Sequence, residues 1–81
     1  MVEQVNDPIE VIVKFEQGKS TPCRFLWKGG EFNISKVNLT YSVREGRNKI
    51  YYFAVSDNNN YFKLQFSTED LNWRIVESYV E

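Results

Sequence analysis

Few side chains in this chain of 81 residues are suited to acid–base or nucleophilic chemistry. The chain has no histidine and one cysteine, Cys23. Because histidine is the commonest general base and metal ligand near neutral pH, the familiar serine or cysteine triads cannot be built. Cys23 follows Pro22 at the start of an apolar segment and has no activating partner in the sequence. We interpret it as a small buried side chain on the same face as Phe25 and Trp27.

Carboxylates are the remaining candidates for catalysis or metal binding. Glu69, Asp70 and Glu77 are near neighbours late in the chain, and paired carboxylates with separated pKa values can hydrolyse glycosidic bonds. Acidic residues at turns and sheet edges, however, usually face solvent. The run 57–60, DNNN, is rich in oxygen but lacks the glycine and distal glutamate of an EF-hand loop, so it is predicted to be a turn. The sequence therefore predicts a protein that is not an enzyme, with no catalytic residue, no cofactor and no metal site.

The charges are unevenly distributed, although the net charge is only −1. Basic residues dominate between Lys14 and Lys49, whereas both ends of the chain are acidic. Basic side chains beside aromatic ones on an open sheet bind single-stranded nucleic acids through phosphate contacts and stacking. The candidate interaction surface consists of Arg24, Lys28, Lys36, Tyr41, Arg44, Arg47 and Lys49.

The aromatic residues have a second explanation, because large rings are also needed to fill the core of a small domain. The isoelectric point of about 5.4 predicts no strong overall attraction to polyanions. We therefore expect an interaction module that binds another protein, through an exposed apolar patch or the free edge of the first or last strand. Single-stranded nucleic-acid binding is the alternative function.

The candidate residues lie on short segments in which apolar and polar residues alternate, separated by glycine, asparagine and charged residues. This period of two is typical of antiparallel strands that bury one face. Six strands are expected, at residues 9–16, 21–28, 31–43, 49–56, 62–67 and 73–79. The segment 49–56 is apolar on both faces and is expected to be a central strand.

The third predicted strand changes parity between Ile34 and Val37. A one-residue shift would turn the later side chains to the wrong face, so a β-bulge or bend is expected near residues 35–36. Short connections favour pairing between sequence neighbours. The sequence thus predicts an all-β fold: a six-stranded antiparallel up-and-down meander curled into a strongly bent sheet or a small barrel.

The length allows one domain, which we place at residues 9–81, preceded by a flexible tail at residues 1–8. No apolar run is long enough to span a membrane, and the first residues lack the pattern of a secretory leader. A lone cysteine is typical of a reducing compartment. These features predict a cytoplasmic protein without a membrane partner, and we expect a monomer or weak dimer.

The segment 21–37 reads TPCRFLWKGGEFNISKV. It resembles a small prokaryotic domain family of unknown function with the pattern Pro-x-Arg-Phe-x-Trp-x-Gly-x-x-Tyr-x-Val, followed by an aromatic strand. The pieces at 51–55, 61–64 and 73–75 follow in the expected order, so the resemblance covers nearly the whole domain. Some relatives are encoded near genes for error-prone repair polymerases, which implies an accessory role in DNA repair. Tyr41 stands where relatives often carry tryptophan, and the chain lacks their arginine-rich character.

Overall fold

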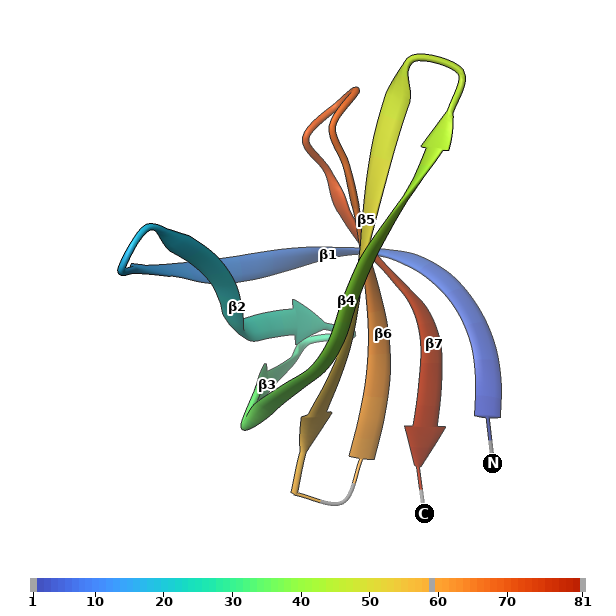
Figure 1. Cartoon of the computed structure of the whole chain (residues 1–81). Helices are drawn as coiled ribbons and strands as arrows, with labels where there is room; N and C mark the ends of the chain where they lie inside the picture. The colour runs from blue at the N-terminus through green and yellow to red at the C-terminus, as the bar shows by residue number, and fades with distance from the viewer. Residues whose placement is uncertain (1, 59, 81) are drawn as a thin grey trace.

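The computed structural model describes residues 2–58 and 60–80, which form one antiparallel sheet of seven strands (Figure 1). The strands are β1 (Val2–Glu16), β2 (Lys19–Trp27), β3 (Gly30–Asn33), β4 (Lys36–Glu45), β5 (Asn48–Asp57), β6 (Asn60–Ser67) and β7 (Trp73–Val80). Their order in the sheet is β3-β2-β1-β7-β6-β5-β4. The predicted all-β antiparallel meander is confirmed, but the predicted number of six strands is wrong.

The seventh strand arises because the predicted strand 31–43 is divided at residues 34–35, where the sequence indicates a bend. The amide of Ile34 donates to the carbonyl of Cys23 at 2.9 Å, and the amide of Ser35 donates to the carbonyl of Ser56 at 2.9 Å. At these two residues the chain therefore passes from the side of β2 to the side of β5. As a result β3 and β4 are neighbours in sequence but occupy opposite edges of the sheet. The sheet does not close into the small barrel that was the second expectation.

Strand β1 is long and curved, and it belongs to two ladders (Figure 1). Its first half pairs with β7 and its second half with β2. The segment predicted as a tail outside the domain is therefore, from Val2 onward, part of a strand that pairs with β7; Met1 lies outside the described residues. The segment lacks a clear alternation of apolar and polar residues, because Asn6 and Asp7 form hydrogen bonds within the chain instead of entering the core. The Asp7 carboxylate accepts a hydrogen bond from the Trp27 indole at 2.9 Å, and Asn6 accepts two from Arg74.

The expectation of a free edge on the first or last strand has a different outcome for each strand: β7 is paired on both sides, whereas each half of β1 has a ladder partner on one side only among the described residues. In the strand order β3 and β4 are outermost, and β1 and β7 pair with each other between them. Strand β5, predicted as central from its two apolar faces, lies next to the edge strand β4.

Two tight turns set the hairpins on either side of β2. Gln17 and Gly18 both have positive φ, and so do Lys28 and Gly29. This geometry matches the right-handed twist of a two-residue hairpin, and glycine adopts it without steric cost. The second turn lies one residue before the predicted Gly29-Gly30 turn, so Lys28 lies in the turn and not on the strand face of Arg24.

The core lies where the inner faces of the two halves of the sheet meet. Its buried members are Phe25, Val55, Phe62, Leu64 and Ile75. The rings of Phe25 and Phe62 meet edge to face at 5.2 Å between centroids, a favourable arrangement for aromatic pairs.

Candidate functional site

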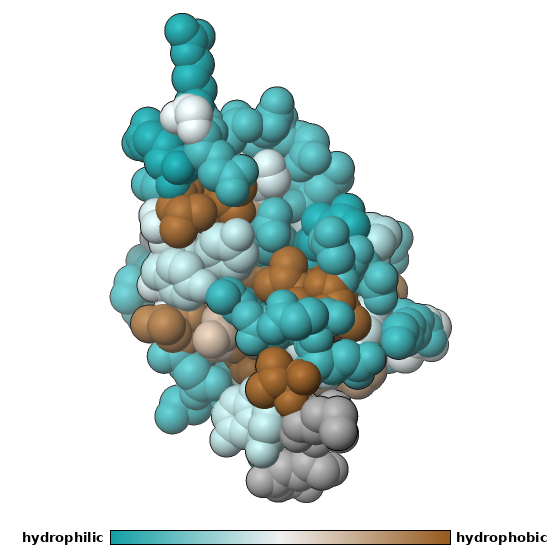
Figure 2. Space-filling model, turned by 90° about the vertical axis from the view of Figure 1, so that its right-hand side faces the viewer, coloured by the Kyte–Doolittle hydropathy of each residue, from teal (hydrophilic) through white to brown (hydrophobic). Residues whose placement is uncertain are grey.

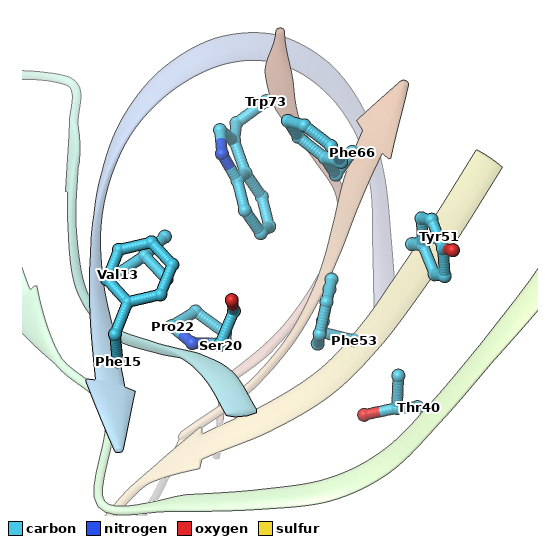
Figure 3. A pocket seen from close by; sticks show the side chains of 9 residues that line it. All are labelled: Val13, Phe15, Ser20, Pro22, Thr40, Tyr51, Phe53, Phe66 and Trp73. Carbon is cyan, nitrogen blue, oxygen red and sulfur yellow. The ribbon is translucent and has the colours of Figure 1, made fainter. Parts of the chain in front are cut away.

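An open cavity of about 490 Å³ lies between the β1–β2 hairpin and the inner face of strands β4 to β7 (Figure 3). We call it the cleft. Its size is within the range of ligand-binding pockets, and aromatic and aliphatic side chains provide most of its lining. The lining residues are Val13, Phe15, Ser20, Pro22, Thr40, Tyr51, Phe53, Phe66 and Trp73.

The sheet side of the cleft is an aromatic cluster built by cross-strand pairing. The Trp73 ring lies 4.8 Å from that of Phe66, its partner across β6 and β7, and 5.3 Å from that of Phe53. Thr40 pairs with Phe53 and therefore shares its face. Half-buried rings held on three adjacent strands form a preformed apolar surface.

The hairpin side of the cleft depends on a β-bulge. Ile12 pairs with Arg24 but Val13 pairs with Pro22, so Cys23 is the extra residue of β2. The bulge turns Pro22 toward the cleft in place of Cys23. The expectation that Cys23 shares the face of Phe25 and Trp27 is therefore wrong; it is half-buried, and its thiol lies 3.3 Å from the carbonyl oxygen of Ile12.

Phe15, near the tip of the β1–β2 hairpin, is the most exposed large apolar side chain among the described residues. It pairs with Ser20 across the hairpin and is 77% exposed. Phenylalanine at this exposure leaves much apolar surface in water, which is unfavourable unless a partner covers it.

Two cations continue the inner face of β4 and β5 beyond the apolar part of the cleft. From Leu39 to Glu45 the ladder is regular, so the pairs Thr40–Phe53, Ser42–Tyr51 and Arg44–Lys49 follow one another on one face. The Lys49 ammonium lies 5.1 Å from the centre of the Tyr51 ring, a cation–π distance. The cleft thus combines an apolar body with a positive end.

Of the other predicted interaction residues, Arg47 lies in the turn between the strand ends that carry these two cations, whereas Arg24, Lys28 and Lys36 lie away from them. Arg24 lies on β2, where its guanidinium is 3.3 Å from the Glu31 carboxylate, and the Lys28 ammonium lies 4.7 Å from the Trp27 ring centre. Lys36 begins β4, and Arg47 is in the turn between β4 and β5. In Figure 1 that turn and the β2–β3 region lie at different ends of the molecule.

Tyr41 is on the outer face of the sheet, opposite to the cleft. Its ring stacks on Tyr52 at 5.1 Å, and the Lys63 ammonium lies 5.3 Å from the Tyr41 ring centre. The Tyr41 hydroxyl raises the pKa of Lys63 above its ordinary value of about 10.5, and Glu77, 3.5 Å from the ammonium, adds to the rise while partial burial opposes it. The side-chain contacts of this cluster link β4, β5, β6 and β7 on the outer face.

We expect the Lys63 cluster to stabilise the fold up to alkaline pH. A pKa that is higher in the folded state than in the unfolded state contributes stability that is present below the unfolded value and is lost as pH rises through the folded value. Near neutral pH the free energy of unfolding of the wild-type protein should exceed that of Lys63→Met by less than about 1 kcal/mol, because the Lys63–Glu77 pair is partly exposed. Urea titrations of both proteins should show this difference shrinking above about pH 10.5. A difference that stays constant up to about pH 12 would contradict the assignment.

The carboxylates considered for catalysis have structural partners. Glu69 accepts a hydrogen bond from the Asn48 amide, Asp70 accepts one from the backbone of Asn72, and Glu77 faces Lys63. Within the part of the chain that the structure describes, no three cysteine or acidic side chains lie close enough together to hold a metal ion.

Figure 2 shows the surface from the right-hand side of Figure 1. On this face the hydrophobic areas are separated by hydrophilic ones and do not form one continuous apolar patch. The cleft is therefore a better candidate site than this face. The sequence did not reveal the cleft, because large rings such as Trp73 were expected to fill the core; the one available signal was the number of rings, which is large for 81 residues.

Residues 2–58 and 60–80 form strands and the segments that connect them, and no membrane-spanning helix is found among them. Comparisons of the chain with protein-family models, with curated proteins and with solved structures found no match.

Proposed function

We propose that the protein is a non-enzymatic interaction module whose cleft receives apolar side chains of a partner protein. The observation that carries the proposal is the open cavity of about 490 Å³ between two arms of the sheet, with Phe15 exposed on one wall and Trp73 on the other. Interface anchors are typically apolar or aromatic side chains that fill pockets of this kind. The lone cysteine and the absence of histidine support a cytoplasmic, non-catalytic role.

Single-stranded nucleic-acid binding has less support. It requires cations and exposed rings to converge on one sheet face. Arg24 instead pairs with Glu31, Lys28 covers Trp27, and Tyr41 is stacked on the outer face, away from Arg44 and Lys49.

The proposal is tested by filling the cleft. A library of random twelve-residue peptides displayed on phage would be selected for binding to the wild-type chain. The affinity of the selected peptides would then be measured for the wild-type chain and for two variants with substitutions on β4. Thr40→Trp places a large ring in the cleft, whereas Val43→Trp places the same ring on the opposite, outer face. We expect Thr40→Trp to weaken binding by at least about tenfold and Val43→Trp to leave it within about twofold. Failure to select any binder, or equal binding by both variants, would refute the proposed function.

A further inference from the structure

We propose that the occupant of the cleft is an extended, acidic segment of the partner protein that adds to the free edge of β4 as an extra strand. This inference rests on the proposed function, since it names the chemistry of the segment that the cleft would receive. Three observations carry it: the free edge of β4, the face that its side chains share with the cleft, and two cations at its end, Arg44 and the neighbouring Lys49 of β5, that form no ion pair among the described residues.

The first observation is the gap in the sheet beside β4. β4 is an edge strand, and β3 covers only Arg24–Trp27 of β2. The earlier part of β2, residues 19–22, therefore has no ladder partner on that side among the described residues. Both free edges flank the opening of the cleft, because Thr40 of β4 and Ser20 of β2 line it. An exposed edge of this kind pairs readily with an extended peptide.

The second observation gives the register of an added strand. Residues directly opposite each other on neighbouring strands project to the same face. Partner residues opposite Thr40 and Ser42 would therefore point into the cleft, whereas the partner residue opposite Arg44 would point at the positive end. The fitting segment has two apolar residues and one acidic residue at alternate positions, with the acidic residue at one end.

The third observation is the charge at that end. Arg44 and Lys49 are directly opposite each other, and like charges in this position are destabilising. Neither has a carboxylate within 4.0 Å among the described residues, although three other lysine or arginine residues form ion pairs. A carboxylate of the added strand would relieve the repulsion. A second copy of this chain is a poorer occupant, because the pairing of two β4 strands would bring basic ends against each other.

The test uses two synthetic peptides with blocked ends, Thr-Glu-Thr-Leu-Thr-Leu-Thr and its reverse order, which cover both strand directions. They would be added to the ¹⁵N-labelled full chain, and amide shifts would be followed by NMR at low salt. We expect one peptide to bind, with shifts concentrated at residues 39–45. Replacing its glutamate with glutamine, or combining Arg44→Gln with Lys49→Gln in the protein, should weaken binding by about tenfold. Lys28→Gln combined with Lys36→Gln is the matched control, since it also removes two positive charges, away from the positive end of the cleft, and it should leave binding unchanged.

Methylation of the peptide's backbone nitrogens at alternate positions tests the strand itself. One of the two methylated sets should abolish binding, because its amides would face β4. The inference is overturned if neither set matters, if glutamate and glutamine peptides bind equally, if deca-thymidine binds more tightly than either peptide, or if neither peptide binds. In each case the proposed function is judged separately, by the library selection and the Thr40→Trp variant.

Discussion

A chain that begins at Ile9 is expected to lose most of its stability. Removal of residues 1–8 deletes the part of β1 that pairs with β7, together with the hydrogen bonds from Trp27 to Asp7 and from Arg74 to Asn6. It would leave β7 as an unpaired edge over that length. We expect a loss of about 3–5 kcal/mol in the free energy of unfolding, which is comparable with the whole stability of a domain this small. Urea denaturation followed by circular dichroism measures it.

The control for this truncation keeps the strand and removes only its side-chain contacts. Asn6→Ala combined with Asp7→Ala should cost about 1–3 kcal/mol, because the β1–β7 backbone ladder and the bond from Arg74 to the Asn6 carbonyl remain. If the truncated chain instead unfolds at the same urea concentration as the full chain, residues 1–8 are the tail that the sequence predicts, and the ladder with β7 contributes nothing measurable.

Residues 2–8, predicted as a tail but observed as part of β1, lack the local signal that identified the other strands. Alternation of apolar and polar residues identified the strands that bury one face, such as β6 with Phe62, Leu64 and Phe66. The parity change after Ile34 located the bend between β3 and β4. Both signals are local, since each depends on which face of one strand is buried.

Long-range features left no such signal. The pairing of β1 with β7 joins segments at opposite ends of the chain, and much of it is made through backbone groups that every sequence carries. The bulge at Cys23 changes which residues of β2 face the cleft, and its one marker, Pro22, is a residue that also begins strands. The positive end of the cleft depends on the β4–β5 register, which places Arg44 opposite Lys49. From sequence these two residues were predicted as interaction candidates together with five others; Arg47 lies in the turn between their strands, and the remaining four lie elsewhere.

Leu64→Ala is the point substitution with the largest expected effect. Leu64 is completely buried on the inner face of β6, between Phe53 of β5 and Ile75 of β7. Truncation to alanine removes buried apolar surface and leaves a cavity that rigid neighbouring strands fill only in part. We expect a loss of about 2–5 kcal/mol, measured by urea or thermal denaturation.

The matched control is Leu39→Ala, the same substitution on β4, where the side chain is 56% exposed. It should change stability by no more than about 0.5 kcal/mol. Similar losses for the two variants would mean that the core is not centred on β6. A large loss confined to Leu64→Ala would instead place the stability of the fold in the packed centre of the sheet, where Leu64 pairs with Phe53 of the cleft. Phe53 and Trp73 of the cleft pack against that core, whereas the exposed ring of Phe15 adds little to it and is explained by a partner.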